Sequence, residues 1–203
     1  KLKIINSPSV IYLKHAFEEL PPVKKDIDIL FFSQPFYEYS FGSDWLKEVG
    51  SLVDDCKNSG LKLTILLHPR DDISKYELFS DRCNIVSNES VRSERENMVY
   101  VARSKIVVVK SSTTRIIPLI LKVPVAYINY CNFVTFPSGL RDLYHSNLQL
   151  ELPGDIGIAF NQVAFNKKKY VNLQNAYLNS KGISQDISLD PIENEINLLI
   201  GCP

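Results

Sequence analysis

Two short groups of polar residues in this sequence have the types and positions needed for phosphate chemistry. His68-Pro69-Arg70 follows the apolar run Leu61–Leu67, and Ser111-Ser112-Thr113-Thr114 follows a second apolar run, 105–110. Proline disfavours helical backbone in the residue before it, so His68 should lie on extended chain at the end of a strand. An imidazole there can donate a hydrogen bond to a phosphate oxygen and can gain charge beside an anion. Arg70 would add positive charge to the same place.

The hydroxyl-rich run 111–114 lies where a strand should turn into a helix. Backbone N–H groups at a helix start attract anions, and hydroxyl groups add further donors. Plain N-capping explains the same residues, and His68 could equally be a strand-end histidine that bonds a loop carbonyl. The run contains neither GxGxxG nor GxxxxGKS, so it carries neither the dinucleotide nor the P-loop signature.

The elements that must position these groups alternate between strand and helix. Long apolar runs are typical of strands buried on both faces, and ligands of such parallel sheets bind beyond the carboxyl ends of the strands. The pattern predicts an α/β fold, a Rossmann-like parallel sheet with helices on both faces. The expected strands are Ile27–Ser33, Leu61–Leu67, Asn84–Ser87, Lys105–Lys110 and Val123–Asn129. The expected helices begin at Ser43 or Asp44, at Ile73 after an Asp71-Asp72 cap, at Glu89, and after Thr113 or Thr114.

Composition limits the function classes. The 203 residues include 23 basic and 23 acidic side chains, and this balance argues against broad nucleic-acid binding. The sequence contains no run of eighteen apolar residues, so it does not predict a transmembrane helix. The four cysteines show no CxxC spacing and are expected to be free thiols. We expect an N-terminal segment and linker at 1–26, the nucleotide-binding domain at 27–150 and a helical tail at 151–203.

The His-Pro and Ser-Ser/Thr motifs, in this order and near this spacing, resemble those of bacterial GT-B glycosyltransferases that use CMP-activated sugars. These are the sialyltransferases and polysialyltransferases of capsule and lipooligosaccharide synthesis, and the CDP-glycerol polymerases of teichoic acid synthesis show a similar pair. The resemblance covers residues 27–129 and implies the C-terminal, donor-binding half of a GT-B fold. It implies transfer of a sialic acid-like sugar to a cell-surface glycan acceptor.

The resemblance also implies roles for individual residues. His68 would hydrogen-bond the CMP phosphate and assist departure of the leaving group, beside Pro69 and Arg70. Ser111, Ser112 and Thr113 would bind the same phosphate, and Ser33 and Gln34 would line the pocket. Glu89 or Glu94 would bind the ribose hydroxyls, although each is equally a solvated helix charge. No cofactor is expected, and no metal, because no Asp-x-Asp motif lies near either turn.

Two departures from related families refine these expectations. Many UDP-sugar enzymes of this fold carry a glutamate shortly after the phosphate turn, whereas residues 115–118 here contain no carboxylate, which favours CMP. The families' catalytic base lies in an acidic-Gly motif of an N-terminal Rossmann domain, and this sequence has no such motif. We therefore expect the chain to bind nucleotide but to turn over poorly, with the missing Rossmann domain as a partner. We also expect it in the cytoplasm, with peripheral association of the parent enzyme at the inner face of the membrane.

Two alternatives remain open: a sugar-nucleotide epimerase-like enzyme, and a non-catalytic α/β interaction module in which both motifs are structural. One further expectation concerns the tail. Residues 170–178 contain too many apolar side chains for a solvated helix, so we expect them to pack against the missing domain.

Overall fold

The structure is a computed structural model that describes residues 15–16, 18–34, 42–87, 93–110, 116–130, 148–150 and 152–180. Its strands are β1 (Ile27–Phe32), β2 (Leu63–Leu66), β3 (Asn84–Val86), β4 (Ser104–Val109), β5 (Val125–Ile128) and β6 (Leu148–Leu150). Its helices are α2 (Gly42–Asn58), α3 (Glu94–Arg103), α4 (Ile116–Ile120) and α6 (Asp155–Ser180), with 3₁₀ turns η2 (Ile73–Lys75) and η3 (Glu77–Phe79).

The six strands form one parallel sheet in the order β3-β2-β1-β4-β5-β6. The parallel sheet expected from the apolar runs is therefore confirmed, and all five expected strands are present within a few residues of their expected bounds. Strand β6 is an addition at the edge, where Leu148 pairs with Ala126. The order reverses direction between β1 and β4, which is the switch point where open α/β sheets bind their ligands.

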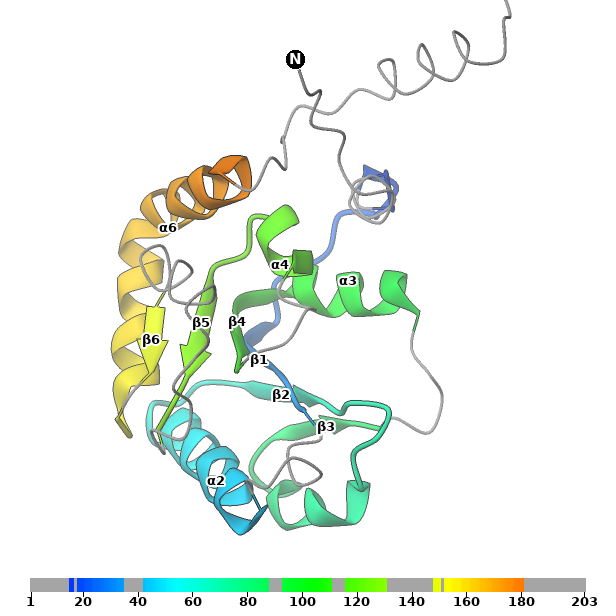
Figure 1. Cartoon of the computed structure of the whole chain (residues 1–203), viewed down its shortest axis with the longest axis vertical. Helices are drawn as coiled ribbons and strands as arrows, with labels where there is room; N and C mark the ends of the chain where they lie inside the picture. Colours follow the sequence, from blue (N-terminus) through cyan, green and yellow to red (C-terminus); the bar gives the residue numbers. More distant parts are fainter. Residues whose placement is uncertain are drawn as a thin grey trace, which may run out of the picture.

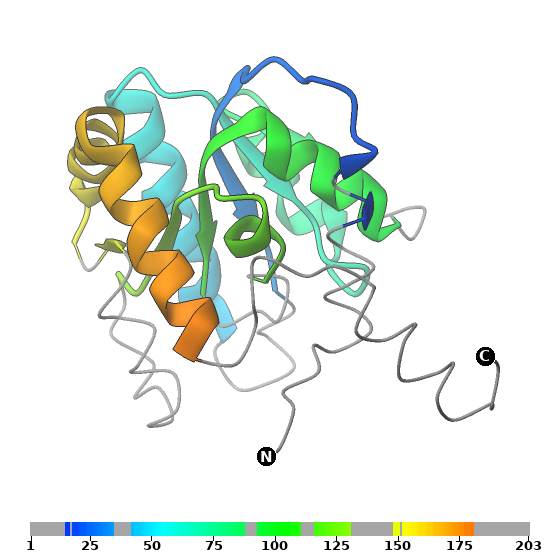
Figure 2. The ribbon, with the colours of Figure 1, turned by 90° about the horizontal axis from the view of Figure 1, so that it is seen from above.

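Helices cover both faces of the sheet (Figures 1 and 2). Alternate strand side chains enter opposite cores: Ile29 and Phe31 pack with α2 and the first half of α6, whereas Leu30 and Phe32 pack with α3 and α4. This alternation follows from the two-residue period of a strand. The core strands are almost completely buried, which explains why their sequences are apolar on both sides.

Helix α6 is kinked at Asn166, whose backbone is not helical (φ −130°, ψ 30°), and it contacts both cores. Its first half packs beside α2, and Leu178 near its end is fully buried in the other core. The buried Gln174 amide donates to the Val123 carbonyl at 3.0 Å. Tyr170 and Tyr177 are partly buried against these same cores, so part of the apolar surface of 170–178 packs within this domain, and its packing against a second domain stays a prediction.

The prediction of an α-helix from Ile73 is wrong, because this segment forms the two 3₁₀ turns η2 and η3. Residues three apart eclipse one another in a 3₁₀ helix, and Tyr76 and Phe79 both use this spacing to reach the core. Of the two expected capping aspartates, Asp72 caps the first turn by accepting from Ser74 N at 3.1 Å. Asp71 is instead buried at the end of β2.

Helix α3 begins after Ser93, which forms a reciprocal capping box with Glu96. Residues 89–92, the start of the helix expected from Glu89, lie outside the described residues. In the described part of the chain, no helix is long and apolar enough to cross a membrane. The two described cysteines, Cys56 and Cys83, are free thiols.

Candidate functional site

The sheet order brings three chain segments to the same carboxyl edge. Strand β1 lies between β2 and β4, so Ser33, which follows β1, lies between His68 after β2 and Lys110 at the end of β4. Residues two strands apart are separated by roughly 10 Å, since neighbouring strands lie about 4.8 Å apart. His68 and Lys110 therefore follow the two strands that flank β1. Ser111, Ser112 and Thr113 themselves lie outside the described residues.

A buried hydrogen-bond cluster fastens the residue that precedes Pro69. The backbone N–H of His68 donates to Ser33 Oγ at 2.7 Å and lies 2.9 Å from Asp71 Oδ2, and the Ser33 hydroxyl donates to the same carboxylate. The Asp71 backbone N–H returns a bond to the His68 carbonyl at 2.9 Å. Ser33 is 3% exposed and Asp71 6%, so both side chains serve this loop from inside the protein. Ser33 was expected to line the pocket, but its hydroxyl is committed to positioning His68.

The histidine ring is fixed by a second bond, because the backbone N–H of Arg70 donates to His68 Nδ1 at 3.1 Å. An Nδ1 atom that accepts a hydrogen bond carries no proton, so the neutral ring carries its proton on Nε2. The His68 side chain is only partly buried. The loop therefore prepares Nε2–H as the ring's donor, which is the arrangement needed to bind an anionic oxygen.

The carboxylate at the centre of this cluster is that of Asp71, and burial disfavours its charged form. Burial raises the pKa of Asp71, while hydrogen bonds from Ser33, from His68 N–H and from Tyr76 oppose that rise. Tyr76 is itself fully buried, and the Trp45 indole N–H lies 3.4 Å from its hydroxyl oxygen. The cluster thus continues from the carboxyl edge into the core beside α2.

Lys110 is a buried cation that the sequence reasoning missed. It directly precedes Ser111, and its ammonium lies 2.5 Å from Glu48 Oε2 of α2 and 5.7 Å from the Trp45 ring centroid. The two charged side chains are 4% and 1% exposed. One signal was available: Glu48 lies three residues after Trp45 and four before Leu52, on the buried face of its helix. A carboxylate on such a face requires a partner.

The remaining expected site residues are more exposed. Gln34 is partly buried directly after Ser33, whereas Pro69 and Arg70 are exposed beside His68. Glu94 lies exposed in the first turn of α3, after the outermost strand β3 rather than beside β1. Glu89 lies outside the described residues. Among the residues that the structure describes, no three His, Cys, Asp or Glu side chains gather to hold a metal ion.

Comparison with known proteins identifies the fold. No protein-family model and no curated protein sequence matches the chain. Among solved structures, MnaA of S. aureus in its UDP co-structure has a TM-score of 0.53 at 11% identity, covering 98% of this chain and 50% of MnaA. A Listeria monocytogenes protein described as a UDP-N-acetylglucosamine 2-epimerase gives 0.51 at 10% identity, covering 85% of this chain and 43% of that protein.

A histidine-to-asparagine variant of the wall teichoic acid polymerase TagF gives a TM-score of 0.50 at 16% identity, over 85% of this chain and 43% of TagF. The chain therefore spans half or less of the length of each of these three proteins. At these identities the likeness concerns the arrangement of strands and helices. The chain has the Rossmann-like α/β fold of a GT-B domain.

Proposed function

We propose that this chain is the donor-binding domain of a glycosyltransferase and binds a CMP-activated, sialic acid-like sugar for transfer to a cell-surface glycan. The observation that carries the proposal is the fixed His68 ring at the carboxyl edge beside the switch point. Its backbone is held by two side chains, and its Nδ1 atom is already used. The N–H of the neutral ring is then Nε2–H, at the carboxyl edge of the sheet, where open α/β folds bind their ligands.

In this proposal His68 Nε2–H donates to the donor phosphate and stabilises the charge that develops on the leaving CMP. Ser111, Ser112 and Thr113, which follow β4 in the sequence, contribute further donors. Helix α4, described over Ile116–Ile120, follows these residues, and their hydroxyl and backbone donors carry the binding. Ser33 and Asp71 act as positioning residues, and Arg70 adds positive charge near the rim.

Calorimetric titration of the chain with CMP tests the proposal. Replacing His68 by alanine should weaken CMP binding by about 1.5–3 kcal/mol, the range for a hydrogen bond to a charged group. His15→Ala is the matched control, because this partly buried histidine lies in the N-terminal segment and pairs with Glu18. Equal affinities in wild type and His68→Ala, with both proteins folded, would contradict the proposed role of His68.

Metal removal gives a second arm of the same experiment. The proposed donors are an imidazole, hydroxyl groups and backbone amides, none of which needs a divalent ion to bind phosphate. CMP affinity should therefore be equal in EDTA and in Mg²⁺. A loss of binding in EDTA would show that a cation completes the site.

A second candidate is a sugar-nucleotide epimerase-like enzyme that binds a UDP-sugar. It is favoured by the similarity to MnaA, whose co-structure contains UDP. The base of the nucleotide separates the candidates, so UDP and CMP should be titrated side by side. Preference for UDP would favour the epimerase-like function, and preference for CMP the transferase. If neither nucleotide binds, the chain is an interaction module on this fold.

A further inference from the structure

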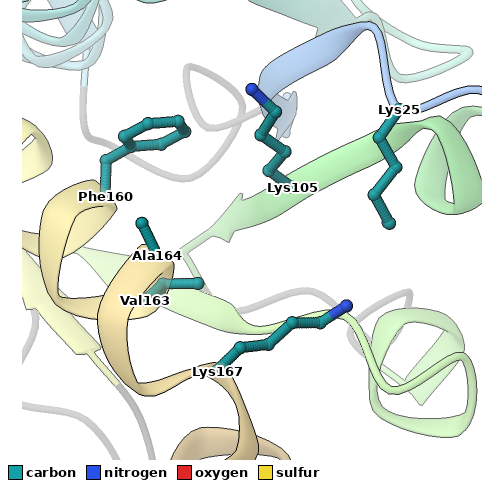
Figure 3. A pocket seen from close by; sticks show the side chains of 6 residues that line it. All are labelled: Lys25, Lys105, Phe160, Val163, Ala164 and Lys167. Atoms are coloured by element: carbon teal, nitrogen blue, oxygen red, sulfur yellow. The ribbon is translucent and has the colours of Figure 1, made fainter.

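A cavity of about 150 Å³ lies at the opposite, amino edge of the sheet. Lys25 precedes β1 and Lys105 is the second residue of β4, while Phe160, Val163 and Lys167 come from the first half of α6 (Figure 3). In a parallel sheet these positions are at the far end of the strands from Ser33 and His68. The cavity is therefore separate from the proposed nucleotide site.

Three lysines line this cavity, Lys25, Lys105 and Lys167, and among the described residues a carboxylate pairs with only one of them. Lys105 Nζ lies 2.7 Å from Asp28 Oδ1. Lys25 Nζ donates only to uncharged carbonyls, those of Ala102 at 3.1 Å and Ser104 at 2.5 Å. Within the part of the chain that the structure describes, no carboxylate pairs with Lys25 or Lys167. Each ammonium has three donors, so the cluster retains both unbalanced charge and unused N–H groups.

The α6 residues that line the cavity before Lys167 are apolar. Val163 is buried, Phe160 is partly buried, and the Lys105 ammonium lies 5.4 Å from the Phe160 ring centroid. Figure 3 shows Phe160 and Val163 on α6, across the cavity from Lys25, while Lys167 extends from the same helix. A cavity of this volume can hold a group the size of a benzene ring. The lining therefore combines a place for a small apolar group with cations for an attached anion.

We propose that this cavity binds a small organic phosphate, with the phosphate among Lys25, Lys105 and Lys167 and its apolar portion against Phe160 and Val163. The site would be filled independently of the nucleotide donor. The same chemistry could reach the cavity as a free phosphate ester or as a lipid headgroup, so both sources are tested.

Phenyl phosphate is the probe for the free ester, and inorganic phosphate is its counterpart without the apolar portion. Phenyl phosphate should bind more tightly, and Lys167→Gln should weaken it by about threefold to tenfold, as expected for the loss of a partly solvated charged donor. Lys168→Gln is the matched control, since this exposed neighbour on α6 does not line the cavity. The control should bind phenyl phosphate like wild type.

Proton uptake supplies a readout that a change in general surface charge would not produce. Burial, and then the neighbouring Lys167, lowers the pKa of Lys25 to about 8. The other charged groups nearby are Lys105 with its partner Asp28, and the pair of Arg103 with Asp26. A bound phosphate would raise the Lys25 pKa again, so binding at pH 8.5 should take up protons. The binding enthalpy should then differ between buffers of different ionisation enthalpy, and Lys25→Gln should remove that difference.

Flotation with phosphatidylcholine vesicles that contain phosphatidylglycerol tests the lipid source. Vesicle binding that Lys167→Gln weakens and Lys168→Gln does not would support a headgroup in the cavity. The proposal is overturned if phenyl phosphate and vesicles both fail to bind. It is also overturned if both lysine variants behave alike, or if His68→Ala and not Lys167→Gln abolishes phenyl phosphate binding, which would place the ligand at the nucleotide edge.

Discussion

At the scale of single residues, the buried carboxylate of Asp71 in the loop after β2 orients one histidine, His68. Asp71 accepts from His68 N–H and from Ser33, and these bonds fix the backbone that carries the ring. Burial nevertheless raises the pKa of this carboxyl group, so its charged form is disfavoured in the folded protein. A loop that keeps such a group for stability alone would gain more from a neutral side chain. This supports a positioning role for Asp71.

The raised pKa of Asp71 predicts a pH dependence of stability. Below the unfolded value of 3.8 both states are protonated and the contribution is fully present; it is lost as pH rises through the higher folded pKa. Asp71→Asn cannot titrate, so wild type should lose stability relative to this variant between about pH 4 and pH 7. Urea unfolding of both proteins at the two pH values measures the change.

Asp72 is the control of opposite sign, because the Ser74 hydrogen bonds lower the pKa of its carboxyl group. Its contribution is present above pH 3.8 and is lost as pH falls through the folded pKa. Wild type should therefore change little relative to Asp72→Asn between about pH 4 and pH 7, and should lose stability relative to this variant only as pH falls below about 3.8. Parallel behaviour of the two variants would show that Asp71 does not titrate as its burial implies.

At the scale of elements, the described strands and helices differ in how far they can be predicted from sequence. Strands β1, β2 and β4 are mostly apolar, and α2 ends before Gly60, whose positive φ of 66° suits glycine. Strand β6 has only three residues and depends on its pairing with β5, far away in the sequence. Local composition carries no sign of such a partner, which is why the sequence did not predict this strand.

In the candidate site too, some residues can be predicted from local sequence and others depend on contacts with distant residues. His68 could be found because a strand end and a following proline are both local features. Asp71 and Asp72 look identical as capping residues, and only the contact of Asp71 with Ser33, 38 residues away, separates their roles. The pairing of Glu48 with Lys110 likewise joins residues 62 apart. Helical spacing could have located Glu48 on a buried face, but not its partner.

The Glu48–Lys110 pair joins α2 to β4 and should be strongly coupled. Replacing Glu48 by leucine leaves a buried, unpaired ammonium and should cost about 3–5 kcal/mol of unfolding free energy. The double variant Glu48→Leu, Lys110→Met should recover most of that loss, since a buried ion pair can be replaced by packed apolar side chains. Denaturant unfolding of the single and double variants measures the coupling. Additive losses would mean that the pair does not interact across this interface.

At the scale of the whole molecule, α6 connects layers that the sheet separates. A turn at Gly154, with a positive φ of 97°, leads into the helix, and the Gly154 N–H donates to Asp55 of α2 at 2.7 Å. The same carboxylate accepts from the Tyr130 hydroxyl after β5 at 2.8 Å. The far end of the helix inserts Leu178 into the core formed with α3 and α4. One helix therefore fastens the β5–β6 edge of the sheet to both cores.

This arrangement predicts that the end of α6 contributes to global stability. Leu178 has no exposed surface, so Leu178→Ala should cost about 2–5 kcal/mol, the range for a buried leucine whose cavity only partly collapses. Leu152→Ala, at a leucine that is 65% exposed, should change stability by no more than about 0.5 kcal/mol. Thermal and urea unfolding of both variants tests this. If Leu178→Ala were as mild as Leu152→Ala, the end of α6 would detach without unfolding the sheet, and its apolar residues would again require a partner outside this domain.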